Sequence, residues 1–135
     1  MNQPTPLRPV PVSETGAAAR RLFVRDLMLD CMIGIHRHER DADQRVRVNI
    51  DLTVRDAKPV DDRIANVISY DDIVAGVKRI VDAGHINLVE TLADRIADFC
   101  LSDSRVIATR VRVEKLDAIA DAASVGVEIE RFRAG

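Results

Sequence analysis

Residues 45–55 read Arg-Val-Arg-Val-Asn-Ile-Asp-Leu-Thr-Val-Arg, and this stretch decides the fold. Every second residue from Val46 to Val54 is aliphatic, and the residues between them are charged or polar. Unbroken alternation of this kind is typical of a β-strand with one buried face and one wet face. The segment therefore predicts a strand of an antiparallel sheet whose second face is solvated.

Shorter alternating segments on both sides of this stretch predict three more strands. The first of them starts at residue 21 and changes phase between Val24 and Leu27, which predicts a bulge or bend near Asp26. The other two cover residues 107–114 and 125–130, where aliphatic residues again alternate with charged residues or glycine. Four strands are therefore expected, two near each end of the folded region.

Two amphipathic helices are predicted between the second and third strands. The first covers residues 70–83, with Ser69 as its start signal and Gly84 as its stop signal. The second opens at Asn87 and breaks at residues 102–104. The order strand, strand, helix, helix, strand, strand predicts an α+β fold, in which both helices cover the one apolar face of an antiparallel sheet.

Length and composition restrict the class of protein. The chain has 135 residues, enough for one domain, and the first 20 residues hold four of the five prolines, which predicts a flexible tail before a domain over residues 21–132. The 20 basic and 22 acidic residues are interspersed, which argues against nucleic acid as a partner, and no apolar run is long enough to span a membrane. Isolated Cys31 and Cys100 favour reduced thiols in a cytoplasmic protein.

The second helix begins with a carboxylate, Glu90, which is open to two interpretations. Asn87 is a good N-cap, and a glutamate three residues later has the spacing of a capping box, which the spacing alone favours. An anionic side chain in the first turn of a helix is also suited to grip a cationic or guanidine-like ligand edge. Both interpretations stay open at this point.

Three other residues are candidates for chemistry. Glu39 lies in a polar loop, Tyr70 is the only tyrosine and stands at the start of the first helix, and Lys115 ends the third strand. Each has a plain structural alternative, namely a solvated loop residue, a ring that packs on its own helix turn, and protection of a strand edge. His36 and His38 alternate on an extended segment, but no metal-ligand spacing accompanies them, so no metal site is predicted.

Four short segments in this order resemble the dihydroneopterin aldolase family, which shares the tunnelling fold with GTP cyclohydrolase and pyruvoyl-tetrahydropterin synthase. The similarity covers residues 21–132. The segments that carry it are Ile33-Gly34-Ile35 followed by Glu39 and Gln44, Ile68-Ser69-Tyr70, Leu88-Val89-Glu90, and Lys115 with Ala122-Ala123-Ser124-Val125-Gly126-Val127.

The resemblance implies a role for each of these residues. Glu90 is implied as the anchor for the 2-amino and N3 hydrogens of a pterin ring, Lys115 as the acid/base residue near N5, and Tyr70 and Glu39 as the groups that order a catalytic water. Further substrate contacts are implied at the backbone of Leu88, Val89, Ile68 and Ser69.

The implied reaction cleaves 7,8-dihydroneopterin to glycolaldehyde and 6-hydroxymethyl-7,8-dihydropterin without a metal, a cofactor or a lysine imine, and epimerises C2′ as a side reaction. Leu116 stands where the family commonly has proline, a form that also resembles the sister enzyme that epimerises dihydroneopterin triphosphate. A non-catalytic pterin-binding oligomer is the third possibility. The resemblance implies a homo-octamer of two stacked tetrameric rings, with each site shared between adjacent subunits.

Overall fold

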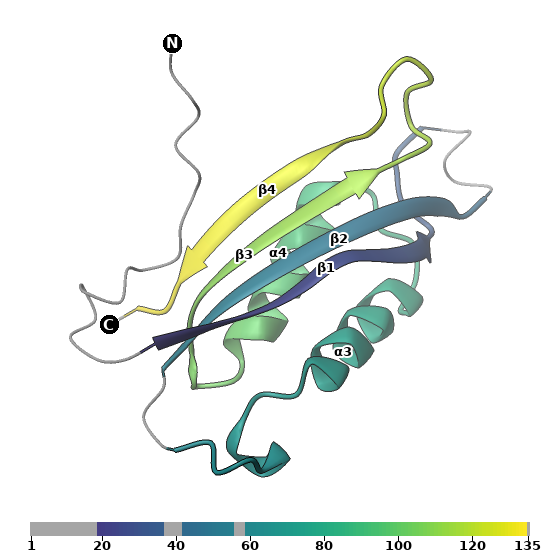
Figure 1. Cartoon of the computed structure of the whole chain (residues 1–135). Helices are drawn as coiled ribbons and strands as arrows, with labels where there is room; N and C mark the ends of the chain where they lie inside the picture. Colours follow the sequence, from purple (N-terminus) through teal and green to yellow (C-terminus); the bar gives the residue numbers. More distant parts are fainter. Residues whose placement is uncertain (1–18, 37–41, 56–58, 135) are drawn as a thin grey trace.

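Four strands and two long helices make up the part of the protein that its computed structural model describes, residues 19–36, 42–55 and 59–134 (Figure 1). In chain order the elements are β1 (Ala19–Cys31), β2 (Gln44–Arg55), the 3-10 helix η1 (Ile64–Asn66), α3 (Tyr70–Asp82), α4 (Val89–Leu101), β3 (Val106–Lys115) and β4 (Val125–Phe132).

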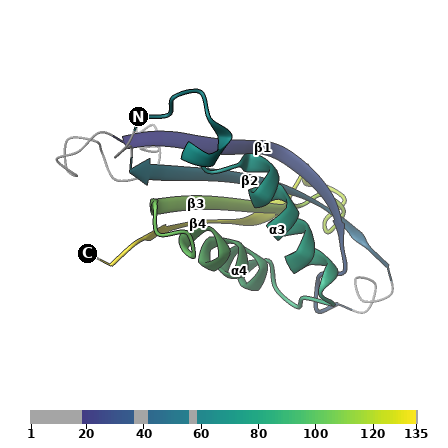
Figure 2. The same ribbon diagram turned by 90° about the horizontal axis from the view of Figure 1, so that it is seen from below.

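The strands form one antiparallel sheet in the order β1-β2-β3-β4, so each strand pairs with its neighbour in the chain. Both helices lie on the same face of this sheet, as the view from below shows together with Figure 1 (Figure 2). The fold is thus a two-layer α+β arrangement, and the predicted order, sheet direction and placement of the helices are confirmed. Strands β1 and β4 form the two edges of the sheet.

The core lies between the sheet and the helices. Four alternate residues in the middle of β2 are at most 1% exposed, as the alternation predicts: Val46, Val48, Ile50 and Leu52. The helices contribute residues spaced three and four apart, which places them on one helical face. These buried helical residues are Ile73, Val77 and Val81 of α3 and Leu92, Ala93, Ile96, Ala97 and Cys100 of α4.

The predicted bulge in β1 is confirmed at Asp26. Pairing with β2 shifts register between Val24 and Leu27, and Asp26 has a φ of 53°. The Asp26 backbone N–H donates to the Asn49 side chain (2.8 Å), and the Asn49 amide donates back to the Asp26 carboxylate (3.2 Å). This reciprocal pair holds the left-handed residue in place.

The ends of the first helix and of the tail differ little from the prediction. Helix α3 follows Ser69 and stops before Gly84, which has a φ of 140°, although the Ser69 side chain makes no capping hydrogen bond. Strand β1 already begins at Ala19, and residues 1–18 of the predicted tail lie outside the described residues. Among the described residues, no helix is both long enough and apolar enough to cross a bilayer.

Candidate functional site

Glu90 lies in the first turn of α4 but does not take part in a capping box. The helix begins at Val89, its N-cap position is Leu88, and no side chain caps it there, so the prediction of an Asn87 cap is wrong. Leu88 is extended (φ −125°, ψ 142°), and the chain two residues before it is bound to the segment after β1, with the Ile86 N–H donating to the Met32 carbonyl (2.8 Å). Glu90 is exposed, and no hydrogen bond or ion pair to its carboxylate occurs among the described residues.

Lys115 ends β3 at the same end of the molecule as Glu90. It pairs with Val46, whose side chain is fully buried against the helices, so Lys115 leaves the sheet on the helix-covered face. Ile86, four residues before Glu90, is bridged to the segment that follows β1. The start of α4 and the end of β3 therefore face the same end of the sheet (Figure 1).

Gln44 was not assigned a role from the sequence, and the structure adds it to this end. It begins β2 two residues before Val46, so it shares a face with Lys115 as a diagonal neighbour across the strands. Gln44 is 7% exposed, and its Oε1 atom is buried and has no hydrogen-bond partner among the described residues. A buried carboxamide oxygen without a donor is suited to bind a ligand N–H or O–H.

Tyr70, Ser69 and Ile68 lie at the opposite end. They line an open cavity of about 590 Å³ together with Val54 and Arg105. Since Val54 pairs with Val106 at the start of β3, the cavity is separated from Lys115 by the length of that strand. A strand of 10 residues is about 30 Å long. Tyr70 is exposed at the mouth of this cavity and is too far from Lys115 to act with it in one protomer.

The described residues therefore divide the predicted site into two groups. Glu90, Val89, Leu88 and Lys115 lie at one end, and Ile68, Ser69 and Tyr70 lie at the other. Glu39 and His38 lie outside the described residues, while His36 is exposed. No group of three or more His, Cys, Asp or Glu side chains within residues 19–36, 42–55 and 59–134 is arranged to hold a metal ion.

The two cysteines are buried free thiols, in accord with the prediction. Burial raises the pKa of Cys31 and of Cys100 to about 11. Both thiols are therefore protonated at neutral pH, and neither is suited to act as a thiolate nucleophile.

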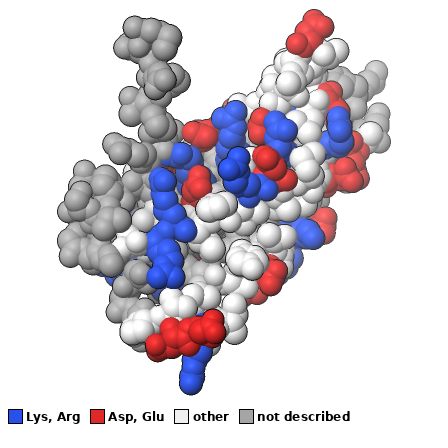
Figure 3. All heavy atoms as spheres, in the orientation of Figure 1, with Lys and Arg blue, Asp and Glu red and all other residues white. Residues whose placement is uncertain are grey.

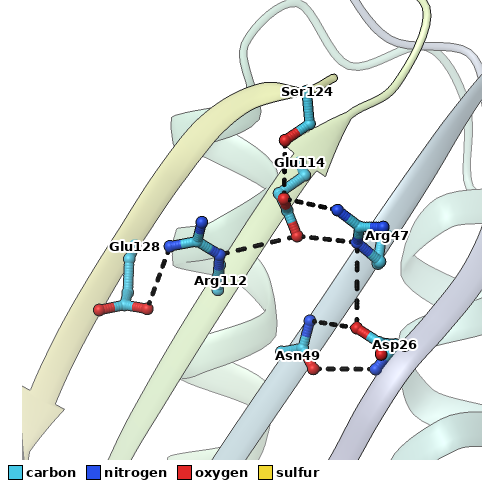
Figure 4. A network of polar contacts seen from close by, with 7 residues as sticks. All are labelled: Asp26, Arg47, Asn49, Arg112, Glu114, Ser124 and Glu128. Atoms are coloured by element: carbon cyan, nitrogen blue, oxygen red, sulfur yellow. Dashed lines mark hydrogen bonds and ion pairs between the residues drawn. The ribbon is translucent and has the colours of Figure 1, made fainter. Parts of the chain in front are cut away.

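The face of the sheet that turns away from the helices carries acidic and basic side chains side by side (Figure 3). Glu114 is the most buried of its charged members, with a side chain only 8% exposed. Arg47 donates to both of its carboxylate oxygens (2.9 and 3.0 Å) and Ser124 donates to one of them (2.7 Å), while Arg112 lies 3.6 Å away (Figure 4). These contacts, foremost the hydrogen bonds from Arg47, lower the pKa of Glu114 to about 2.

The protein has a tunnelling fold: a four-stranded antiparallel sheet in β-β-α-α-β-β order with two helices on one face. The second of these helices has a carboxylate open to solvent at its start. The sequence profile of the dihydroneopterin aldolase family matches residues 22–130, so the chain belongs to this family. A dihydroneopterin aldolase of Streptomyces coelicolor is 36% identical over 100 residues, which are 73% of this chain and 83% of that protein.

Two solved structures agree with this assignment. The dihydroneopterin aldolase of Burkholderia thailendensis, bound to guanine, is 40% identical with a TM-score of 0.76, and the match covers 86% of this chain and 93% of that one. The Escherichia coli dihydroneopterin aldolase in complex with neopterin is 30% identical with a TM-score of 0.77, covering 83% and 98%.

Proposed function

We propose that the protein cleaves the side chain of 7,8-dihydroneopterin to give glycolaldehyde and 6-hydroxymethyl-7,8-dihydropterin. The observation that carries this proposal is the exposed carboxylate of Glu90, which does not cap α4 and lies at the same end of the fold as Lys115. The guanine and neopterin bound by the two solved relatives share a 2-amino group beside a ring N–H. The names of the relatives favour this aldolase activity over epimerisation of the triphosphate.

Glu90 binds the pterin through the edge that carries the 2-amino group and the N3 hydrogen. Two parallel N–H groups match two carboxylate oxygens, and hydrogen bonds to an ionised acceptor are about twice as strong as neutral ones. The start of α4 favours the ionised carboxylate, because the helix dipole places partial positive charge there. Backbone groups of Leu88 and Val89 and the free oxygen of Gln44 contact the remaining polar edge of the ring.

Lys115 donates a proton to ring N5. Cleavage of the C1′–C2′ bond leaves an electron pair, which moves into the C6=N5 imine of the substrate as N5 takes up the proton. A water held by Tyr70 and Glu39 removes the proton of the 2′-hydroxyl, so glycolaldehyde leaves as a neutral aldehyde. Proton return to C1′ and loss of the N5 proton restore the imine, and addition of glycolaldehyde to the opposite face before it leaves epimerises C2′.

Each active site is formed by two protomers. Lys115 and Glu90 come from one protomer, and the cavity lined by Ile68, Ser69 and Tyr70 comes from its neighbour, because one protomer holds these groups at opposite ends. Exposed apolar side chains occur at both ends, and the edge strands β1 and β4 are open to pairing in the single chain. Tetrameric rings that stack in pairs as an octamer would pair the open strand edges and cover the exposed apolar side chains. The exposed apolar residues concerned are Met32, Ile35 and Leu88 at the Lys115 end and Ile64 at the other.

Parallel incubation with 7,8-dihydroneopterin and with its triphosphate tests the activity, with products separated by chromatography. We expect 6-hydroxymethyl-7,8-dihydropterin from the free compound. Conversion of the triphosphate alone would assign the epimerase activity instead, and pterin binding without any turnover would assign a non-catalytic binding protein. Light scattering at micromolar concentration tests the assembly, and a monodisperse monomer would contradict the shared site.

A further inference from the structure

Two arginines of β2 bind the carboxylates on either side of Lys115. Arg47 holds Glu114, the residue before Lys115, through two hydrogen bonds of 2.9 and 3.0 Å. Arg45 holds Asp117, which lies two residues after Lys115. The Nη2 atom of Arg45 lies 2.7 Å from Oδ1 of Asp117, and the backbone N–H of Arg45 donates to Oδ2 (3.2 Å). The end of β3 is therefore attached to β2 by side chains both before and after Lys115.

Backbone pairing and the β3–β4 connection extend this attachment. The Leu116 N–H donates to the Arg45 carbonyl (3.0 Å), which continues the β2–β3 ladder one residue past the strand. Ser124, just before β4, donates its hydroxyl to Glu114 (2.7 Å), so one carboxylate joins β2, β3 and the connection (Figure 4). A Cβ atom added at Gly126, opposite Glu114, would stand 1.9 Å from the Val113 carbonyl oxygen, so β4 runs unusually close to β3 at this point.

Glu114 and Lys115 are adjacent and therefore point to opposite faces of the sheet. The carboxylate is satisfied by Arg47 and Ser124 on the face away from the helices, so it is not available to neutralise the ammonium of Lys115. Its burial makes the arrangement rigid, because breaking a bidentate pair would leave a charge with little access to water.

We propose that Glu114 is a positioning residue for Lys115: held by Arg47 and Ser124, it fixes the end of β3 and so the direction in which the lysine enters the site. The inference rests on the proposed role of Lys115 as the proton donor to N5. Proton transfer requires donor and acceptor within hydrogen-bond distance, so a small shift of this strand end lowers turnover more than it lowers pterin binding by Glu90.

Glu114→Gln tests this inference, because it keeps the shape of the side chain and removes the charge that binds Arg47 bidentately. We expect kcat for 7,8-dihydroneopterin to fall about 10-fold, while KM and the affinity for neopterin change less than about twofold. Ser124→Ala gives a milder test that perturbs folding less, with a kcat loss of about threefold that Ser124→Thr restores because threonine keeps the hydroxyl. All rates are normalised to the concentration of neopterin-binding sites.

Glu130→Gln is the matched control. Like Glu114, Glu130 lies on the face of the sheet away from the helices, but on β4, and it pairs with an arginine of β3, Arg110 (3.8 Å). The Arg110–Glu130 pair is four residue pairs further from Lys115 along the β3–β4 ladder than Glu114 is. We expect the control to lower the melting temperature and to leave kcat per site unchanged. Equal kcat losses in Glu114→Gln and Glu130→Gln, or full activity in Glu114→Gln and Ser124→Ala, would overturn the positioning role. An inactive wild-type protein would instead refute the proposed function.

Discussion

Replacement of Glu90 by glutamine separates a ligand anchor from a helix cap. Glutamine keeps the size of the side chain and one acceptor oxygen, but in the proposed complex it places an NH2 group where the second carboxylate oxygen would face a ring N–H. Two charge-assisted hydrogen bonds, each contributing about 2 kcal/mol, are then replaced by one neutral bond of about 1 kcal/mol. The expected loss of binding is about 2 to 3 kcal/mol, or about 30- to 150-fold in Kd.

The same substitution has little effect on folding. Glu90 makes no hydrogen bond or ion pair among the described residues, and the N-cap position of α4 belongs to Leu88. Only the favourable interaction of the carboxylate with the helix start is lost, about 0.5 kcal/mol, which corresponds to a fall of a few degrees at most in melting temperature.

Titration with neopterin, followed by calorimetry, measures the affinity, and thermal unfolding of the same samples measures the stability. Asp94→Asn is the matched control, because Asp94 is an exposed carboxylate one turn further along α4 that pairs with Arg131 (2.9 Å). We expect the control to bind neopterin as tightly as the wild type. An unchanged neopterin affinity in Glu90→Gln, with a sharp fall in melting temperature, would refute the role of Glu90 as the pterin anchor. It would favour a role of Glu90 in capping α4 instead.

Three further changes have defined outcomes. Lys115→Met should reduce both cleavage and epimerisation about 10²- to 10⁴-fold with a small change in neopterin affinity, and wild-type turnover in this variant would exclude the lysine as proton donor. Tyr70→Phe should slow formation of the hydroxymethyl product, measured by single-turnover kinetics, because it removes the hydroxyl that we propose orders the catalytic water. The pKa of Glu114 is lowered to about 2 from the ordinary 4.5, so its ion pair stabilises the fold above pH 4.5, and this contribution is lost as the pH falls toward 2. The melting temperature of Glu114→Gln should therefore depend less on pH between 4.5 and 2 than that of the wild type. Identical pH profiles of the two proteins would contradict a stabilising ion pair at Glu114.

Local patterns in the sequence predicted the elements of this fold well, because each element buries one regular face. The alternation from Val46 to Val54 needs no distant information, and the change of phase at Asp26 marks the bulge by itself. The start of α4 was different. A contact between Ile86 and the segment after β1 lies just before the extended Leu88, and such a long-range contact leaves no mark in the local spacing around Asn87.

The resemblance implied the candidate residues and a site shared between subunits, but local patterns in the sequence did not give the arrangement of these residues within one protomer. Whether Tyr70 and Lys115 share one protomer depends on the direction of α3 relative to β3, which no short motif encodes. The buried, unpaired oxygen of Gln44 and the pairing of Glu114 with Arg47 depend on the register between β2 and β3. These features appear only when two strands are aligned, so single-sequence patterns did not reveal them.

The separation of Tyr70 from Lys115 has a consequence for genetics. A chain that lacks a working Lys115 still presents an intact Tyr70 end, and a chain that lacks a working Tyr70 still presents an intact Lys115 end. In the proposed ring, intact ends of two such chains face one another at some of the interfaces and form a complete site there. We therefore expect two alleles that are each defective alone to complement one another when they are expressed in the same cell.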